Sequence, residues 1–172
     1  LYLEYSLFGS TQDGTLETTP SWSDNITDTT TSIAWGDIDG NGYLDLVVGN
    51  YNNPDKVYLN QGGTLQTPAD WESGVSNWTY SIALGDVDGD GDLDLAAGLS
   101  GNNEVYLNQN GSLQTSPAWT ADDNDLTYDV AWGDADRRQP GSDRKLPPVG
   151  STVNVNNATW TNTIGDAELI TV

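Results

Sequence analysis

Two stretches of sequence decide the fold: SIAWGDIDGNGYLDLVVGN at residues 32–50 and SIALGDVDGDGDLDLAAGL at residues 81–99. They are two copies of one pattern, and the same spacing recurs outside them. Trp22, Trp71 and Trp119 lie 49 and 48 residues apart. Self-similarity at a period of this length predicts a repeat architecture, in which each repeat is one supersecondary unit.

Each copy divides into four short segments separated by Gly, Asn, Asp and Pro. In the first copy these are residues 32–36, 44–48, 57–60 and 64–71. Their side chains alternate with a period of two, which predicts strands, and no stretch carries a helical apolar stripe. The sequence therefore predicts an all-β fold made of β-propeller blades with four antiparallel strands each. An irregular β-sandwich is the alternative, and the extent of identity between the copies disfavours it.

The repeats divide the chain into about three blades. We expect a partial blade of two strands at residues 1–24, complete blades at 25–72 and 73–120, and a degenerate partial blade with a β-like tail at 121–172. Propellers typically have four to eight blades, so three do not close a ring. The chain starts at Leu1 without an apolar leader. We therefore expect either a fragment of a larger propeller or an open one whose edges pair with another copy.

The turn between the first two strands of each copy carries the chemistry. Its nine positions hold oxygen-bearing side chains at 1, 3, 5 and 9 and Gly at 6. Alternate spacing turns successive side chains toward one point, and Gly at 6 allows the reversal that presents the carbonyl of position 7. Calcium accepts such an irregular set of six or seven oxygens more readily than magnesium does. The predicted ligands are Asp37, Asp39, Asn41, Tyr43 and Asp45 in the first copy and Asp86, Asp88, Asp90, Asp92 and Asp94 in the second.

A solvated hairpin loop that needs no ion is the plain alternative for an Asp- and Gly-rich turn. Two carboxylates about 5 Å apart repel by roughly 3 kcal/mol at an effective dielectric near 20, which a bound cation turns into attraction. Neither turn is an EF-hand, because position 12 is Val48 or Ala97 and the flanks are strands. The sequence favours two calcium sites with a structural role.

The pattern D-x-D-G-N/D-G-x-L-D-L, followed by small residues and Gly, resembles the FG-GAP/VCBS repeat family, which is also found in the calcium-binding blades of integrin α-chain propellers. The resemblance covers roughly residues 1–136. It implies a β-propeller, calcium in the blade loops at the ten positions above, and an extracellular or cell-surface location. It also implies roles in adhesion, carbohydrate recognition or as an accessory module of a secreted enzyme.

Composition narrows the function further. The 172 residues include 5 Lys and Arg against 26 Asp and Glu, a formal net charge of −21, and no His, Cys or Met. Disulfides, thiolate or imidazole metal sites and Ser-His-Asp or Cys nucleophiles are therefore excluded, and any metal is held by oxygen. A surface this acidic repels nucleic acid and anionic lipid, and no apolar run is long enough to insert into a membrane.

These observations favour a non-catalytic, calcium-stabilised extracellular module for adhesion or recognition, with carbohydrate binding as one form of it. Glycans or another protein are the expected partners besides calcium, together with further copies of the chain through open edges. The alternatives are a structural subunit that assembles into a surface fibre, and the accessory part of a larger secreted enzyme.

The repeat fails after residue 136. Asp134 and Asp136 open a third loop, but Arg137-Arg138-Gln139-Pro140 occupies the positions where an acceptor, a Gly and a carbonyl are needed. We expect no calcium there. A basic patch, an Arg replacing a lost calcium, and a shifted reading frame or sequence error are three interpretations of this segment.

Overall fold

The protein folds entirely as β-structure in the part of the chain that the computed structural model describes. Residues 20–122 and 124–133 are described in full, and six short strands outside them by their backbone alone. These six are β1 (Leu7–Phe8), β2 (Thr11–Gln12), β3 (Thr15–Leu16), β14 (Thr152–Val155), β15 (Ala158–Thr161) and β16 (Glu168–Thr171). No helix that could cross a membrane occurs in the described part.

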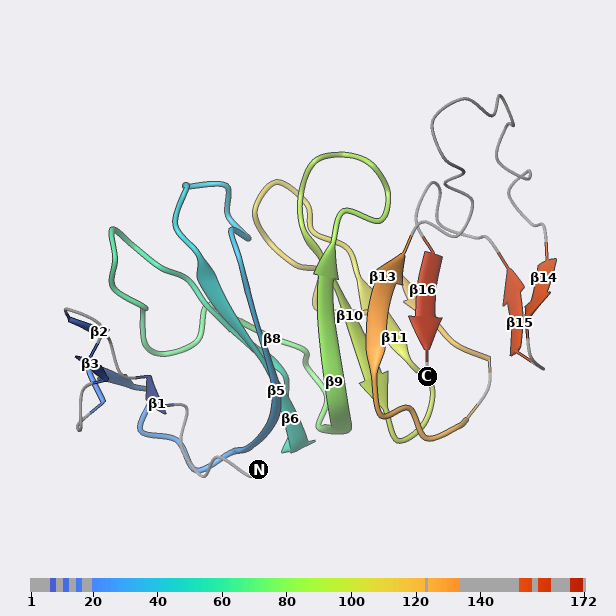
Figure 1. Ribbon diagram of the computed structural model, residues 1–172, viewed down its shortest axis with the longest axis horizontal. Coiled ribbons are helices and arrows are strands. Elements are labelled where there is room, and N and C mark those ends of the chain that lie inside the picture. The colour runs from blue at the N-terminus through green and yellow to red at the C-terminus, as the bar shows by residue number, and fades with distance from the viewer. Residues whose placement is uncertain are drawn as a thin grey trace.

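The two sequence repeats form two four-stranded antiparallel meanders, which we call blade 1 and blade 2 (Figure 1). Blade 1 consists of β5 (Thr29–Gly36), β6 (Asp45–Asn53), β7 (Lys56–Tyr58) and β8 (Trp71–Glu72). Blade 2 consists of β9 (Asn77–Gly85), β10 (Asp94–Leu99), β11 (Glu104–Tyr106) and β12 (Trp119–Thr120). The predicted fold class, blades of four antiparallel strands in an incomplete propeller, is confirmed.

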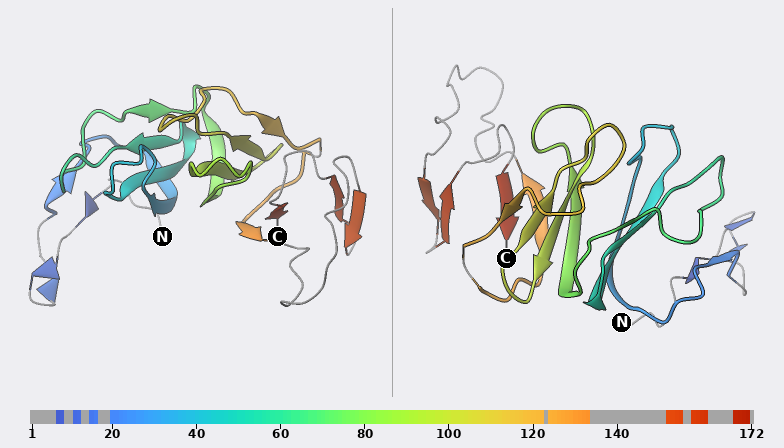
Figure 2. Two further views of the ribbon diagram at one scale, coloured as in Figure 1. Left: turned by 90° about the horizontal axis from the view of Figure 1, so that it is seen from above. Right: turned by 180° about the vertical axis from the view of Figure 1, so that it is seen from behind.

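Further strands flank the two blades. On the N-terminal side, β1 pairs with β4 (Trp22–Ser23), and on the C-terminal side β13 (Val130–Gly133) pairs with β16. Seen from above, the strands follow an arc instead of closing a ring (Figure 2). This arc agrees with the expectation that about three blades do not close.

The two blades meet at a short ladder and at a shared core. Tyr51 of β6 pairs with Trp78 of β9, which joins the meanders into one curved sheet. Between the blades lies an apolar cluster contributed by both sides. Its buried members are Ile38, Val47, Val57 and Trp71 from blade 1 and Ile82, Leu95, Tyr106 and Leu113 from blade 2. Burial of this surface is the main force that holds neighbouring blades together.

Two of the three tryptophans that recur with the repeat period, Trp22 and Trp71, pack against the following blade. The Trp22 ring meets Tyr58 edge-on at 5.1 Å, and the Trp71 ring meets Tyr106 in the same way at 5.3 Å. Each indole N–H donates to a carbonyl of the following blade, Trp22 to Leu65 and Trp71 to Gln114. The ends of one blade are thereby anchored on the next.

The predicted fourth strand is longer than the observed one. Residues 64–71 were expected to be extended, but β8 contains only Trp71–Glu72, and Leu65 forms a single bridge with Asn60. The third strand ends at Tyr58, two residues before the predicted end. Gly62 and Gly63 adopt positive φ, so the segment after β7 reverses direction before a ladder can form.

Candidate metal sites

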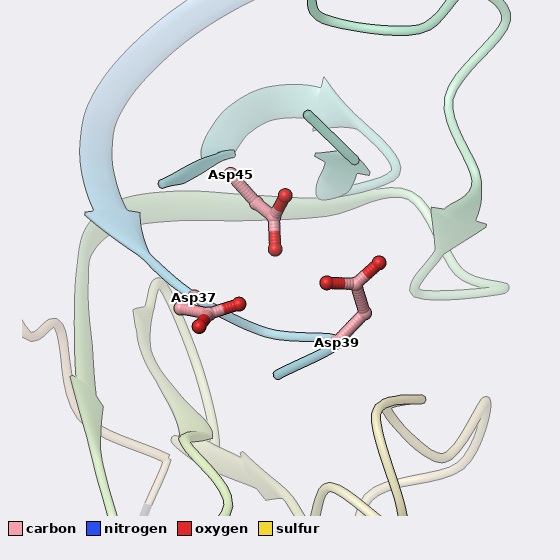
Figure 3. A group of neighbouring side chains, drawn as sticks. All are labelled: Asp37, Asp39 and Asp45. Carbon is pink, nitrogen blue, oxygen red and sulfur yellow. The ribbon is translucent and has the colours of Figure 1, made fainter. Parts of the chain in front are cut away.

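The first acidic loop connects β5 to β6 and brings three carboxylates together. Asp37 and Asp39 come from the loop, and Asp45 is the first residue of β6. One oxygen of each lies within 4.8 Å of one oxygen of each of the others. Figure 3 shows the three side chains directed toward a common space. The carboxylates at positions 1, 3 and 9 of the loop therefore lie together.

The second acidic loop repeats this geometry between β9 and β10. Asp86, Asp88 and Asp94 have one oxygen each within the same 4.8 Å limit. Asp86 and Asp88 are exposed and Asp94 is fully buried. Both clusters consist of carboxylate oxygens only, which is the donor set that hard cations such as Ca²⁺ prefer.

The buried aspartate at position 9 is the anchor of each cluster. Asp45 accepts backbone N–H groups from Ile38 (2.7 Å) and Asn60 (2.6 Å), and Asp94 accepts them from Val87 and Asn108 (both 2.8 Å). Each carboxylate oxygen has a second lone pair, so these bonds leave room for a cation. Each carboxylate is thus held by two backbone N–H groups, one in its own loop and one just after the third strand of its blade.

Burial raises the pKa of both anchors. Desolvation is the largest cause at Asp45 and Asp94, and the backbone hydrogen bonds oppose it without cancelling it. Neighbouring carboxylates add to the increase, Asp39 at the first anchor and Asp88 with Asp90 at the second. A raised pKa means that the negative charge on each anchor is unfavourable without a counter-charge, and a bound cation would supply one.

The remaining predicted ligands lie in the loops but outside the three-carboxylate clusters. Asn41 donates its amide to Asp39 (3.0 Å) and accepts the backbone N–H of Tyr43 (2.8 Å). The carboxylate of Asp90 accepts the N–H of Asp92, while the Asp92 carboxylate accepts the N–H of Asn110. The prediction at position 7 concerns the backbone carbonyl of Asp92 and is independent of this side-chain bond.

The backbone of both loops requires glycine at two positions each. Gly40 and Gly42 in the first loop and Gly89 and Gly91 in the second have φ between 72° and 98°. L-residues rarely adopt this conformation, which explains the glycines in the motif. A Cβ at any of the four would meet nothing within 4 Å, so the loops need glycine for their conformation and not for space.

Sequence reasoning missed two asparagines that support the clusters. Asn60 and Asn108 follow the third strand of their blades, and their backbone N–H groups donate to Asp45 and Asp94. Asn60 also donates its amide to the carbonyl of Leu44 at 3.0 Å, next to the anchor. The signal was present in the sequence, since the tetrapeptide VYLN ends at each of them.

Comparison with known families agrees with this geometry. Residues 37–97 match the FG-GAP-like repeat family. The match begins at the first residue of the first acidic loop and contains both loops. Residues 113–172 match a family described as a protein of unknown function, DUF3604. No curated protein matches the chain.

The segment 37–97 is therefore an FG-GAP-like repeat region, and the resemblance inferred from the sequence is confirmed for it. The match supports a β-propeller-like module, in agreement with the two blades of the structure.

Proposed function

We propose that the protein is a non-catalytic β-propeller module of the extracellular space whose blades are stabilised by calcium in the two acidic loops. The observation that carries the proposal is the pair of buried anchors, Asp45 and Asp94, each facing two further carboxylates. Within residues 20–122 and 124–133 the single basic side chain, Lys56, forms an ion pair with Asp28. No cationic side chain of this part therefore neutralises either cluster.

A structural role follows from where the loops lie. Each anchor begins the second strand of its blade, and the residue at position 2, Ile38 or Val87, is buried in an apolar cluster. An ion held by the loop would fix the first hairpin of the blade and the side chain that packs beneath it. Calcium at about one hundred times its dissociation constant would add roughly 2.7 kcal/mol of stability per site.

The proposed location follows from the same loops. Calcium sites of extracellular modules have modest affinity, with dissociation constants of about 10⁻⁴ to 10⁻³ M. Asp37 and Asp39 are half-buried, while Asp86 and Asp88 are exposed, so solvent reaches both clusters. We expect both sites to be of this type and to remain filled outside the cell.

Calcium titration with thermal unfolding tests the proposal. The melting temperature should rise as calcium is added, and magnesium at the same concentration should have a smaller effect. Replacing Asp88→Asn should remove part of the rise, whereas Asp122→Asn, an exposed carboxylate outside both clusters, is the matched control for lost charge. A melting temperature of the unsubstituted protein that does not change when calcium is added would refute the metal assignment.

A row of aromatic side chains favours recognition as the purpose of the module. Tyr51 stacks on Trp78 with ring centroids 5.0 Å apart, Tyr80 meets Tyr51 edge-on at 6.2 Å, and Tyr128 lies 5.5 Å from Tyr80. Trp78 is 45% exposed and Tyr128 66% exposed. The row crosses the junction from β6 to β9 and reaches Tyr128, two residues before β13.

Exposed aromatic rings can stack on the apolar face of a pyranose ring. The hydroxyl groups of the same sugar can form hydrogen bonds with nearby amide side chains. Asn52, whose side chain accepts the indole N–H of Trp78, is one such amide. We therefore propose neutral glycans as the ligand class. Retention on a glycan array that is lost in Trp78→Ala but kept in Trp35→Ala, another exposed tryptophan, would support this assignment. Equal retention by both variants would contradict it.

Assembly through open edges remains the second candidate. The outer strands β8 and β12 contain two residues each and pair on one side only in the eight-stranded sheet. Unpaired strand edges favour association with other chains. Sedimentation of the calcium-loaded protein distinguishes the candidates, because a fibre subunit forms large species and a recognition module stays small. An accessory role beside a secreted enzyme is the third candidate, and linked catalytic sequence would identify it.

A further inference from the structure

One turn of blade 2, residues 108–113, lies against the acidic loop of blade 1. The side-chain amide of Asn108 donates to the carbonyl of Ile38 across 2.8 Å. Ile38 lies between two members of the first cluster. Gly111 of the same turn approaches Asp39 so closely that a Cβ on it would lie 3.0 Å from the Asp39 Cα and 3.1 Å from its carbonyl oxygen.

The same turn also holds the acidic loop of its own blade. The backbone N–H of Asn108 donates to the anchor Asp94 at 2.8 Å, and its amide donates to the carbonyl of Leu93 at 3.2 Å. The backbone N–H of Asn110 donates to the Asp92 carboxylate at 2.9 Å. The 108–113 turn is thus in contact with both acidic loops at once.

The contact at Ile38 reaches the first cluster directly. The N–H of Ile38 donates to the anchor Asp45, its side chain is buried between the blades, and its carbonyl is held by Asn108. A movement of this residue therefore displaces Asp37 and Asp39 on either side of it. The position of the Asn108 amide is linked to the arrangement of the first cluster through a single residue.

The buried side chain of Asn108 carries a cost that its two donor bonds offset. Its side chain is fully buried, and its Oδ1 atom has no hydrogen-bond partner among the described residues. A buried acceptor without a partner carries a free-energy penalty. An apolar residue of similar size would avoid this penalty but would leave the carbonyls of Ile38 and Leu93 without their shared donor.

From these contacts we propose that Asn108 couples the two acidic loops, so that a cation in one loop raises the cation affinity of the other. The inference rests on the proposed calcium function and names a regulation of the same sites. A cation in the second loop fixes Asp94 and Leu93, and with them the Asn108 amide. The amide then holds Ile38 in the arrangement that the first cluster needs, and by linkage the effect is reciprocal.

Asn60 provides the matched comparison, since it occupies the same place in blade 1. Its N–H donates to Asp45 and its amide to the carbonyl of Leu44, as Asn108 does in its own blade. Its Oδ1 atom accepts the N–H of Gly63 at 2.8 Å. Within the described residues the Asn60 side chain bonds only to its own loop and turn. Substitution of Asn60 therefore removes the side-chain hydrogen bonds to its own loop and turn but leaves the contact between Asn108 and Ile38 intact.

The experiment measures the affinity of the first loop with and without a functional second loop. Terbium replaces calcium at oxygen sites, and its emission is sensitised by a nearby tyrosine. Tyr43 lies in the first loop, whereas the second loop has Asp92 at that position. The second loop is disabled by Asp86→Asn with Asp88→Asn, two cluster members that do not belong to the 108–113 turn. Calorimetric titration with calcium gives the total number of sites.

Disabling the second loop should weaken terbium binding at the first loop by about fivefold or more, the lower end of typical couplings between sites. In the Asn108→Ala background the same change should have an effect of less than about twofold, and in the Asn60→Ala background the full effect should remain. Gly111→Ala, which displaces the turn from Asp39 without touching Asn108, should also reduce the coupling.

The outcomes separate this inference from the proposed function. Two calcium sites that bind independently in the unsubstituted protein, or a coupling that survives Asn108→Ala, would overturn the inference and leave the calcium sites in place. No calcium binding at either loop would overturn the proposed function and the coupling together.

Discussion

Replacement of Asp55 by Asn should stabilise the protein at neutral and alkaline pH. Asp55 is 4% exposed and lies where the two blades join. Its carboxylate accepts the backbone N–H of Asn50 at 2.8 Å and the hydroxyl of Thr79, at the start of blade 2, at 3.0 Å. Burial raises the pKa of Asp55 from its ordinary value of 3.8 to about 7, with a smaller contribution from Glu104, because these two hydrogen bonds do not fully replace water.

The sign and size of the effect follow from that pKa. Between about pH 4 and about pH 7 the folded protein keeps a proton on Asp55 that the unfolded chain has lost. Stability therefore falls as pH rises through this window and is lowest above it. A difference of about three pKa units corresponds to about 4 kcal/mol at 1.36 kcal/mol per unit. This amount is a large part of the stability of a typical domain.

The second repeat shows that Asn suits this position. Asn103 corresponds to Asp55, accepts the backbone N–H of Leu99 at 2.9 Å, and donates its amide to the hydroxyl of Thr127 at 2.8 Å. The geometry of the joint is thus the same with a neutral side chain. Asp55→Asn should be nearly neutral at about pH 4 and stabilising by up to about 4 kcal/mol at about pH 8.

Urea unfolding followed by tryptophan fluorescence, at several pH values and with a calcium chelator, measures this difference. The other buried carboxylates are present in both proteins. The difference in the free energy of unfolding between the unsubstituted protein and the variant therefore isolates the contribution of Asp55. The reverse change, Asn103→Asp, should introduce a pH dependence of the same sign. A variant that is less stable at about pH 8, or a difference that does not vary with pH, would refute the reasoning.

Three further results are expected. Trp71→Phe loses the N–H bond to the Gln114 carbonyl and part of the buried indole, so urea unfolding should show a loss of about 1–3 kcal/mol. An unchanged midpoint would contradict the anchoring role. Gly49→Ala places a Cβ 2.9 Å from side-chain carbons of Ile82 and Thr79 and should cost about 1–3 kcal/mol by the same measurement, with tolerance of Ala arguing against close blade contact. Calcium at about one hundred times its dissociation constant should add about 5 kcal/mol over the chelated protein if both loops fill, and a gain near 3 kcal/mol would indicate a single site.

The sequence alone determined the elements and the position of the chemistry. Alternating apolar and polar side chains predict a strand, because neighbouring residues of a strand point to opposite faces. The Asp and Gly positions of the nine-residue loop likewise depend only on residues close together in sequence. The predicted strands at 32–36 and 44–48 therefore lie within β5 and β6, apart from the single residue Leu44. The clusters of Asp37, Asp39 and Asp45 and of their counterparts in blade 2 follow from the same local spacing.

Tertiary structure decided what links the blades, because the residues concerned are far apart in sequence and carry no shared local pattern. Asn108 reaches Ile38 across 70 positions, and the buried Asp55 accepts a hydrogen bond from Thr79 of blade 2, 24 positions away. Trp71 at the start of β8 likewise contacts Tyr106 and Gln114 of the next blade, which lie more than 30 positions away along the chain. The periodicity of the sequence specifies the strands of each blade. The contacts buried between successive blades specify how a change in one blade affects the next.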